Sequence, residues 1–257
     1  MPWPNAGVAP GRSPRGLMAD WGGVDGCREG WVLAVVDAAR RIVVLHVLRT
    51  FAEVALETQN VSLTLADIPI GLPSGESARE RLCDAIARKE LGPRASTVFP
   101  VPAREAVWAD SYAEACRRNE KILGRKLSKQ SWGICPKIRE VDAVLRIAPK
   151  LQERIRETHP ELCFRWLNRG KIIEDPKRSQ AGRRIRRELL EQWTTNLETA
   201  MKQARRAHRT REATPDDLLD AVAAAVAARL AGEGQVKSIP LAPERDAAGL
   251  RMEIVGI

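Results

Sequence analysis

The sequence is poor in aromatic residues, and its cysteines and histidines form no familiar spaced motif. Only 4% of the residues are aromatic, and a single Tyr is among them. The five cysteines are scattered without C-x-x-C spacing, which argues against a zinc site or a disulfide framework and favours a reducing compartment. The three histidines suggest no Ser-His-Asp arrangement, so nothing indicates a serine hydrolase.

Long hydrophobic runs are also missing. No stretch of 18 apolar residues occurs, so the sequence predicts no transmembrane helix. The first 17 residues are rich in Pro, Gly and Arg and lack the apolar core of a signal peptide. We interpret residues 1–17 as a disordered extension, or Met18 as the true start, and residues 18–257 as the folded domain. A cytoplasmic protein is expected.

Positive charge is abundant. The net charge is +9 with a pI near 9.7, which fits a polyanionic partner such as nucleic acid without requiring one. The basic residues are densest between residues 171 and 211, where two helices are expected. Because aromatic residues are not interleaved with these charges, the pattern favours a solvated, phosphate-attracting face over a base-reading site. The basic residues are Lys177, Arg178, Arg183, Arg184, Arg186, Arg187, Lys202, Arg205, Arg206, Arg209 and Arg211.

The first carboxylate of interest is Asp25, in the glycine-rich stretch 22–31. We place it on a glycine-flanked turn ahead of two β-branched runs, 31–37 and 42–48, which predict a hairpin. An acid beside closely approaching backbone suits a metal or phosphate ligand. The alternative is an ordinary Asp-Gly turn.

A second carboxylate, Asp67, follows the alternating strand 61–66. A short helix over 50–57, with Thr50 as N-cap, precedes that strand. The prolines that follow Asp67 end the strand, so this acid is expected at its carboxyl end, where ligands of open α/β sheets bind. An Asx-type turn is the alternative interpretation of Asp67.

The middle of the chain has helical patterns. We expect a helix over 76–91 and a helical insertion over about 93–157, with breaks at Gly124, Gly133 and Pro136. Residues 159–167 then alternate and predict a strand, in which Glu161 shares a face with Cys163 and Arg165.

The last helix is strongly signalled over residues 214–232. Thr214 is suited to the N-cap and Gly232 to the end. Asp217 and Asp220 are three residues apart and share a face, although first-turn acids also occur because they favourably meet the helix dipole. Residues 235–257 predict a loop and a final strand at 250–255.

Three strands, a helix, a strand, helices, a strand and a helix is the element order of a ribonuclease-H-like fold. The sequence also resembles the domain-of-unknown-function family 429, described as predicted ribonuclease-H-like nucleases, over nearly all of residues 21–255. The Asp-x-x-Asp-Ala element is similar to the last helix of Holliday-junction resolvases. The motifs that carry the family resemblance are Gly23-Val-Asp-Gly-Cys with Gly30-Trp31, Asp67-Ile-Pro-Ile-Gly-Leu-Pro73, Leu127-Ser-Lys-Gln130, Lys137-Ile-Arg-Glu-Val-Asp142, His159-Pro-Glu161 and Asp217-Leu-Leu-Asp-Ala221.

The resemblance implies an α/β protein with a mixed five-stranded sheet flanked by helices, and a helical insertion between the fourth and fifth strands. It also implies metal-dependent hydrolysis of phosphodiester bonds in DNA or RNA. Oxygen ligands for one or two Mg²⁺ or Mn²⁺ ions would come from Asp25, Asp67, Asp217 and Asp220. Glu161 is an auxiliary catalytic candidate, and Lys137 and Lys129 are candidates for stabilising phosphate charge.

Two other functions remain open. A non-catalytic module that binds nucleic acid or protein would tolerate Asp25→Asn, or even be stabilised by it in the apo form, because the substitution relieves charge repulsion. A phosphotransferase of the actin-like superfamily needs two copies of the domain and a hydroxyl in the phosphate turn. The turn here reads Asp-Gly-Cys-Arg-Glu-Gly and the chain of 257 residues is short for two copies, so this alternative is weaker.

Overall fold

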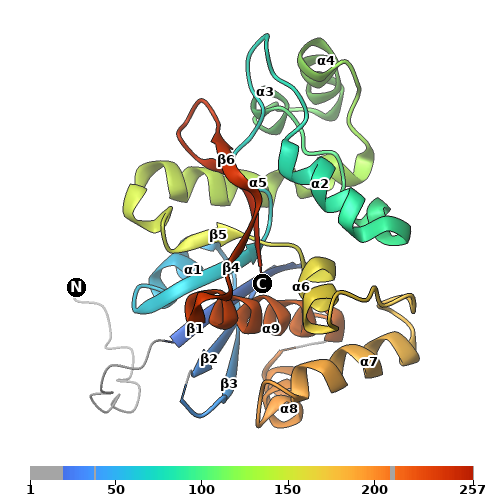
Figure 1. The fold of residues 1–257 in the computed structure, drawn as a ribbon. Coiled ribbons are helices and arrows are strands. Elements are labelled where there is room, and N and C mark those ends of the chain that lie inside the picture. The colour runs from blue at the N-terminus through green and yellow to red at the C-terminus, as the bar shows by residue number, and fades with distance from the viewer. Residues whose placement is uncertain (1–19, 38, 209–211, 257) are drawn as a thin grey trace, which may run out of the picture.

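A mixed five-stranded sheet forms the centre of the computed structural model, which describes residues 20–37, 39–208 and 212–256 (Figure 1). The strand order is β3-β2-β1-β4-β5. The extension expected at 1–17, Met18, and Arg209 and Arg211 of the basic segment lie outside the described residues. The strands are β1 (Asp20–Cys27), β2 (Gly30–Asp37), β3 (Val43–Leu48), β4 (Val61–Asp67) and β5 (Ile155–Glu157).

The first three strands are antiparallel neighbours. β2 pairs with β3 from Trp31↔Leu48 to Val36↔Val43, which confirms the hairpin predicted from the two β-branched runs. The prediction that Asp25 lies on a turn is wrong, because β1 continues through it and pairs Asp25 with Val32 of β2. The chain reverses only after Cys27, so the glycines around Asp25 are strand residues.

β4 and β5 complete the sheet as parallel strands. β4 lies parallel to β1, after the capped helix α1 (Phe51–Glu57), and β5 pairs with β4 through three residues. The predicted strand at 159–167 is wrong, because helix α6 (Pro160–Leu167) occupies that segment. The apolar residues of this segment fit both the two-residue period of a strand and the 3.6-residue period of a helix. Pro160 at the first helical position favours the helix.

Helices cover both faces of the sheet. Val32, Ala34 and Val36 of β2 pack in one core with α6, α7 (Gln180–Glu191), α8 (Leu197–Ala207) and α9 (Pro215–Leu230). Trp31 and Leu33 point the other way, into a second core with α1 and α5 (Lys129–Ile147). This alternation is the period of two expected for a strand buried on both faces.

Helix α9 lies unusually close to β1. A Cβ added at Gly23 would stand 2.1 Å from both the Ala221 carbonyl oxygen and the Ala225 amide nitrogen, so only glycine allows this approach. Alanines and valines along α9 are buried, as the seam of small side chains predicts. The acids in the first two turns of α9 are therefore brought toward the end of β1.

The segment between β4 and β5 is helical. α2 begins at Leu82 rather than at 76, and α5 runs without interruption through Gly133 and Pro136, so the predicted breaks there are wrong. No helix of the described ranges is both long and apolar enough to cross a membrane. The elements of this segment are α2 (Leu82–Leu91), η1 (Gly92–Thr97), α3 (Arg104–Val107), α4 (Tyr112–Leu123), α5 and η2 (Pro149–Leu151).

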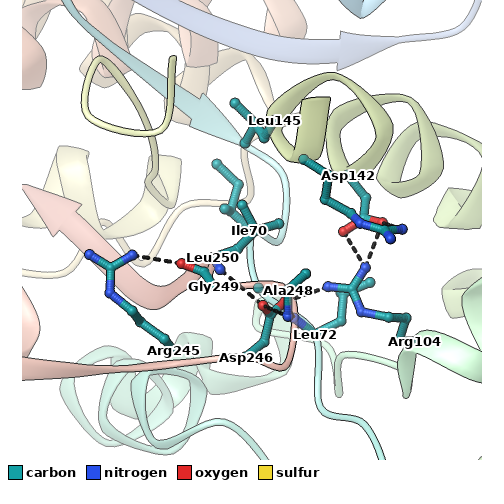
Figure 2. A network of polar contacts seen from close by, with 12 residues as sticks. Ile70, Leu72, Arg104, Asp142, Leu145, Arg245, Asp246, Ala248, Gly249 and Leu250 are labelled. Atoms are coloured by element: carbon teal, nitrogen blue, oxygen red, sulfur yellow. Dashed lines mark hydrogen bonds and ion pairs between the residues drawn. The ribbon is translucent and has the colours of Figure 1, made fainter. Parts of the chain in front are cut away.

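A C-terminal hairpin fastens this segment to the sheet domain. After η3 (Ala231–Gln235), β6 (Lys237–Arg245) pairs with β7 (Arg251–Gly256), although a loop was expected before residue 250. Figure 2 shows Asp246, between these strands, accepting hydrogen bonds from the backbone amides of Leu72, Ala248 and Leu250. Arg104 bridges Asp246 to Asp142 of α5, which ties the hairpin to two helices that follow β4.

Candidate functional site

Two of the predicted carboxylates are neighbours on the sheet. Asp25 of β1 and Asp67 of β4 are partners in the parallel register, and both lie near the carboxyl ends of their strands. Opposite residues of paired strands present their side chains on the same face, so the two carboxyl groups lie side by side. Asp25 is only 7% exposed, and Asp67 lies at the partly open end of β4.

The third carboxylate comes from the other end of the chain. Asp220 of α9 is 3% exposed and faces the same cavity as Asp25 and Asp67. The Nζ of Lys177, on the segment before α7, donates a hydrogen bond of 2.9 Å to the Asp220 carboxylate. A lysine is therefore the resident counter-charge of a three-carboxylate cluster, which we call the acidic cluster (Asp25, Asp67 and Asp220).

The cavity beside this cluster has a volume of about 520 Å³. It lies between the ends of β1, β4 and β5 on one side and η1, α5 and α6 on the other. Acidic side chains outnumber basic ones along its wall, although the whole chain carries a net charge of +9. The acids are Asp25, Asp67, Asp84, Glu157, Glu161 and Asp220, and the basic residues are Arg81, Arg94, Lys137 and Lys177.

Burial and mutual repulsion change the protonation of the cluster. Burial, then the charges of Asp67 and Asp220, raise the pKa of Asp25 well above its ordinary value. Burial likewise raises the pKa of Asp67, against the lowering effects of His159, Lys177 and a hydrogen bond with Asp25. Burial raises the pKa of Asp220 to about 6, although Lys177 acts to lower it. Burial and mutual repulsion thus make all three carboxyl groups harder to ionise than free aspartates.

The donor chemistry of the cluster suits a hard divalent cation, because carboxylate oxygens are the ligands that Mg²⁺ and Mn²⁺ prefer. The present side-chain orientations do not form a complete coordination shell for a metal ion. Within the described ranges, no three Asp, Glu, His or Cys side chains are grouped as ligands of one ion. One Asp220 oxygen is bonded to Lys177, and the carboxyl groups of Asp25 and Asp67 interact with each other, so all three acids are directed at protein partners.

Asp217 has a different position from the other predicted ligands. Its side chain accepts a hydrogen bond of 2.7 Å from the Thr214 amide and closes the capping box of α9. It does not line the cavity, although its charge is near enough to contribute to the raised pKa of Asp25. Of the two α9 acids, the structure brings only Asp220 into the acidic cluster.

Glu161 lines the cavity from α6, but its carboxylate already forms ion pairs with two arginines. Arg186 of α7, 1% exposed, donates to both oxygens at 2.8 and 3.0 Å, and Arg94 donates from η1 at 2.9 Å. Glu161 joins three elements through these ion pairs. The strand prediction also gave it one wrong companion, because on a helix Glu161 shares a face with Arg165, four residues on, but not with Cys163.

The two predicted lysines differ in their surroundings. Lys137 lines the cavity, donates a hydrogen bond of 2.5 Å to the Gly30 carbonyl, and lies 4.6 Å from the centre of the Trp31 ring. Burial lowers the pKa of Lys137. Lys129 is exposed in the first turn of α5 and does not line the cavity.

Sequence reasoning missed the ion pairs that surround the cluster. Lys177 was noted only as part of the basic segment, and nothing local marks it as the partner of Asp220. Arg81 and Glu157, which both line the cavity, form a buried pair with Arg81 Nη2 2.7 Å from Glu157 Oε1. These partners are 43 and 76 positions apart in the chain, so no sequence spacing could reveal them.

Comparison with known families gives one result. A family model described as Protein of unknown function (DUF429) matches residues 23–245. The chain belongs to this family. The DUF429 match confirms the family resemblance and includes every residue of the acidic cluster together with Glu161 and Lys177. No curated protein and no solved structure matches the chain.

Proposed function

We propose that this DUF429 protein is a metal-dependent nuclease with a ribonuclease-H-like fold. The observation that carries the proposal is the acidic cluster, in which Asp25, Asp67 and Asp220 share one buried end of a cavity. Gathering three carboxyl groups in a buried place costs stability through desolvation and repulsion. Such a cost is expected where the charges are needed to bind a cation or to perform chemistry.

The arrangement of the sheet supports the finer fold assignment. Its strand order is β3-β2-β1-β4-β5, with the first three strands antiparallel and the last two parallel. The acids come from the first strand, from the end of the fourth strand and from the last long helix, as the element order predicts. Ligands of α/β sheets bind outside the carboxyl ends of strands, which is where this cavity opens.

Each residue of the cluster has a distinct part in the proposed reaction. A divalent ion held by Asp25, Asp67 and Asp220 would supply an activated water and polarise the scissile phosphate. Lys177 offsets the charge of the carboxylates when the protein is unloaded, and its ammonium group is placed to attract a phosphate oxygen. Lys137 and Arg94 add positive charge to the same wall. Asp217 fixes the first turn of α9 and positions Asp220.

The basic face of α7 and α8 supports a nucleic-acid substrate. We use this name for Arg178, Arg184, Arg205 and Arg206, which are exposed on or beside these helices. Arg183 of α7 pairs with Asp216 of α9, one turn before Asp220, so the face is continuous with the helix that carries the acid. Positive charge beside the site would attract a phosphate backbone.

The test combines metal binding with hydrolysis. Mn²⁺ is titrated into wild type, Asp25→Asn and Asp67→Asn while thermal unfolding is followed, and the same proteins are incubated with single-stranded, duplex and branched DNA and RNA. We expect Mn²⁺ to raise the unfolding temperature of the wild type alone, and each substitution to reduce cleavage at least 100-fold, since losing one ligand disrupts the metal site.

Asp110→Asn is the matched control, because Asp110 is exposed and does not line the cavity. It should keep both the metal response and the cleavage. Intact substrates across the whole panel with wild type and Mn²⁺ would refute the nuclease. A metal response that persists in Asp25→Asn would refute the assigned ligands.

A non-catalytic nucleic-acid-binding module is the second candidate, and the ion pair between Lys177 and Asp220 favours it. A lysine that already neutralises the cluster reduces the need for a metal. This candidate predicts that Asp25→Asn binds nucleic acid as well as the wild type does, with no cleavage by either protein. The same panel, measured for binding as well as for products, separates the two functions.

A further inference from the structure

The wall of the cavity is not only polar. Apolar side chains from three parts of the chain line it, and we call the space that they bound the apolar compartment: Val98 and Phe99 after η1, Ile134 of α5 and Ile254 of β7. Val98 and Ile254 belong to one buried apolar cluster, and Phe99 and Ile134 pack against another. Phe99 and Ile134 remain partly exposed, so their free surfaces face open space.

A metal site alone gives no reason for this apolar wall. Ions and phosphates are bound by charged and polar groups, whereas apolar and aromatic walls with a few polar groups are typical of organic ligands. The volume of about 520 Å³ also lies within the usual range of small-molecule pockets, about 300–1,000 Å³. A ligand that fills the whole cavity must therefore combine an anionic or cation-binding part with an apolar part.

We propose that this compartment, bounded by Phe99 and Ile134, accepts one unpaired nucleobase next to the phosphate at the acidic cluster. The proposal rests on the nuclease function and specifies its substrate as a nucleotide whose base is not paired. A base held in a duplex stack cannot enter such a pocket, and enzymes that act on single nucleotides take them out of the stack. Stacking on an aromatic ring would bind any of the bases.

The compartment also has polar groups for the edge of a base. Gln130 lines the cavity from the first turn of α5, and its amide can both donate and accept hydrogen bonds. Thr97 lines it from η1, where its hydroxyl donates to the Arg94 carbonyl at 2.8 Å and keeps an acceptor free. A few polar groups on an apolar wall are what orient a ligand in such pockets.

Gly133 offers a way to fill this compartment without disturbing the cluster. It lines the cavity from α5, and a Cβ added there would meet no atom within 4 Å. Gly133→Trp therefore places a large side chain at the cavity, whereas Gly133→Ala is the matched small control. Both replace a helical glycine, so neither is expected to unfold α5. Phe99→Ala is an independent variant that removes the stacking surface.

The experiment measures binding with two matched pairs of probes in the presence of Mg²⁺. The first pair is deoxyadenosine 5′-monophosphate and deoxyribose 5-phosphate, which differ by the base. The second pair is a single-stranded ten-nucleotide DNA and a closed duplex without unpaired bases. In the wild type we expect the monophosphate to bind about tenfold or more tightly than deoxyribose 5-phosphate, and the single strand to bind about tenfold or more tightly than the duplex. This is the scale of one base stacked on an aromatic ring. Gly133→Trp and Phe99→Ala should lose both preferences, and Gly133→Ala should keep them.

Other outcomes refute the inference. Equal affinity for the two members of each pair, or an unchanged preference in Gly133→Trp with an unaltered unfolding temperature, would exclude a base in this compartment. Binding of the monophosphate without binding of the strand would make a free nucleotide the ligand and overturn a nucleic-acid substrate. Base-dependent binding without any hydrolysis would instead defeat the nuclease while leaving the compartment in place, so the two failures are distinguishable.

Discussion

At the scale of single residues, the main feature is how differently the buried acids are compensated. Glu161 is 8% exposed and is bonded by Arg186 and Arg94, and Glu157 is bonded by Arg81, so these acids form structural ion pairs. Among the described residues, Asp220 is the one member of the acidic cluster with a hydrogen bond from a basic side chain, that of Lys177. The carboxylates of the candidate site therefore have fewer basic hydrogen-bond partners than Glu161 and Glu157, which are paired with arginines.

This difference predicts an unusual response of stability to pH. Burial first, and then the charges of Asp67 and Asp220, raise the pKa of Asp25 above the unfolded value of about 3.9. A group with a raised folded-state pKa adds stability below its unfolded pKa, and that contribution is lost as the pH rises through the folded pKa. Without metal, Asp25→Asn should therefore unfold about 3–6 °C above the wild type at pH 8, and at nearly the same temperature at pH 4.

Thermal unfolding followed from pH 4 to pH 8 with a chelator present tests this prediction. Asp110→Asn is again the control, because it removes an exposed acid and should follow the wild type throughout. A stability gain in Asp25→Asn that is equal at pH 4 and pH 8 would show that repulsion between ionised carboxylates is not its cause.

At the scale of elements, the contact between β1 and α9 decides where the acids meet. Gly23 and Asp25 lie on the same face of β1, because residues two apart in a strand share a face. Gly23 admits the backbone of α9 at Ala221 and Ala225, and the preceding turn then places Asp220 near Asp25. The glycine and the alanines of this contact are thus part of the construction of the site.

Gly23→Ala should destabilise the protein by about 2–3 kcal/mol or more, since its Cβ would collide with helix backbone that no side-chain rotation can move. Chemical denaturation measures this change. Gly133→Ala is the matched control, because its Cβ meets no atom within 4 Å and alanine is favoured over glycine in a helix by about 0.5–1 kcal/mol. Equal effects of the two substitutions would refute the close approach.

At the scale of the whole molecule, charge is distributed unevenly. The chain carries +9, yet acids outnumber bases around the cavity, and exposed arginines cover the face made by α7 and α8. The positive face attracts a polyanion over a distance, whereas the acidic cavity would require a cation before a phosphate could approach closely.

Replacing Arg178, Arg184, Arg205 and Arg206 by Gln should weaken nucleic-acid binding for all sequences alike. Each lost phosphate contact lowers the slope of log affinity against log salt by about 0.7 for a single strand, so the slope should fall by up to about 3. Binding measured across a salt series gives this slope. A matched control replaces Lys89, Arg117, Lys121 and Lys126, which are exposed on or near α2 and α4, and its slope should equal that of the wild type. A smaller slope in the control alone would move the interface to α2 and α4.

The elements with strong local signals could be predicted from the sequence. The hairpin of β2 and β3 follows from two β-branched runs, and α9 follows from Thr214, Pro215 and a run of helix formers. The position of Asp67 at the end of β4 follows from the prolines after it. These features depend on neighbours within a few residues, which is why periodicity and capping rules reach them.

Tertiary contacts decided the rest. The sequence of 159–167 is short and apolar, so it does not distinguish a strand from a helix. β5 has only three residues, and each pairs with a β4 residue 91 positions earlier in the chain. That Lys177 meets Asp220, that Arg186 meets Glu161, and that α5 covers the acidic cluster to form a cavity all depend on segments distant in the chain. The sequence by itself determined which acids were available, that Asp67 ends a strand, and that Asp217 and Asp220 share a helix. Packing alone determined which acids share a cavity and which are neutralised by ion pairs, because charges interact according to distance in space.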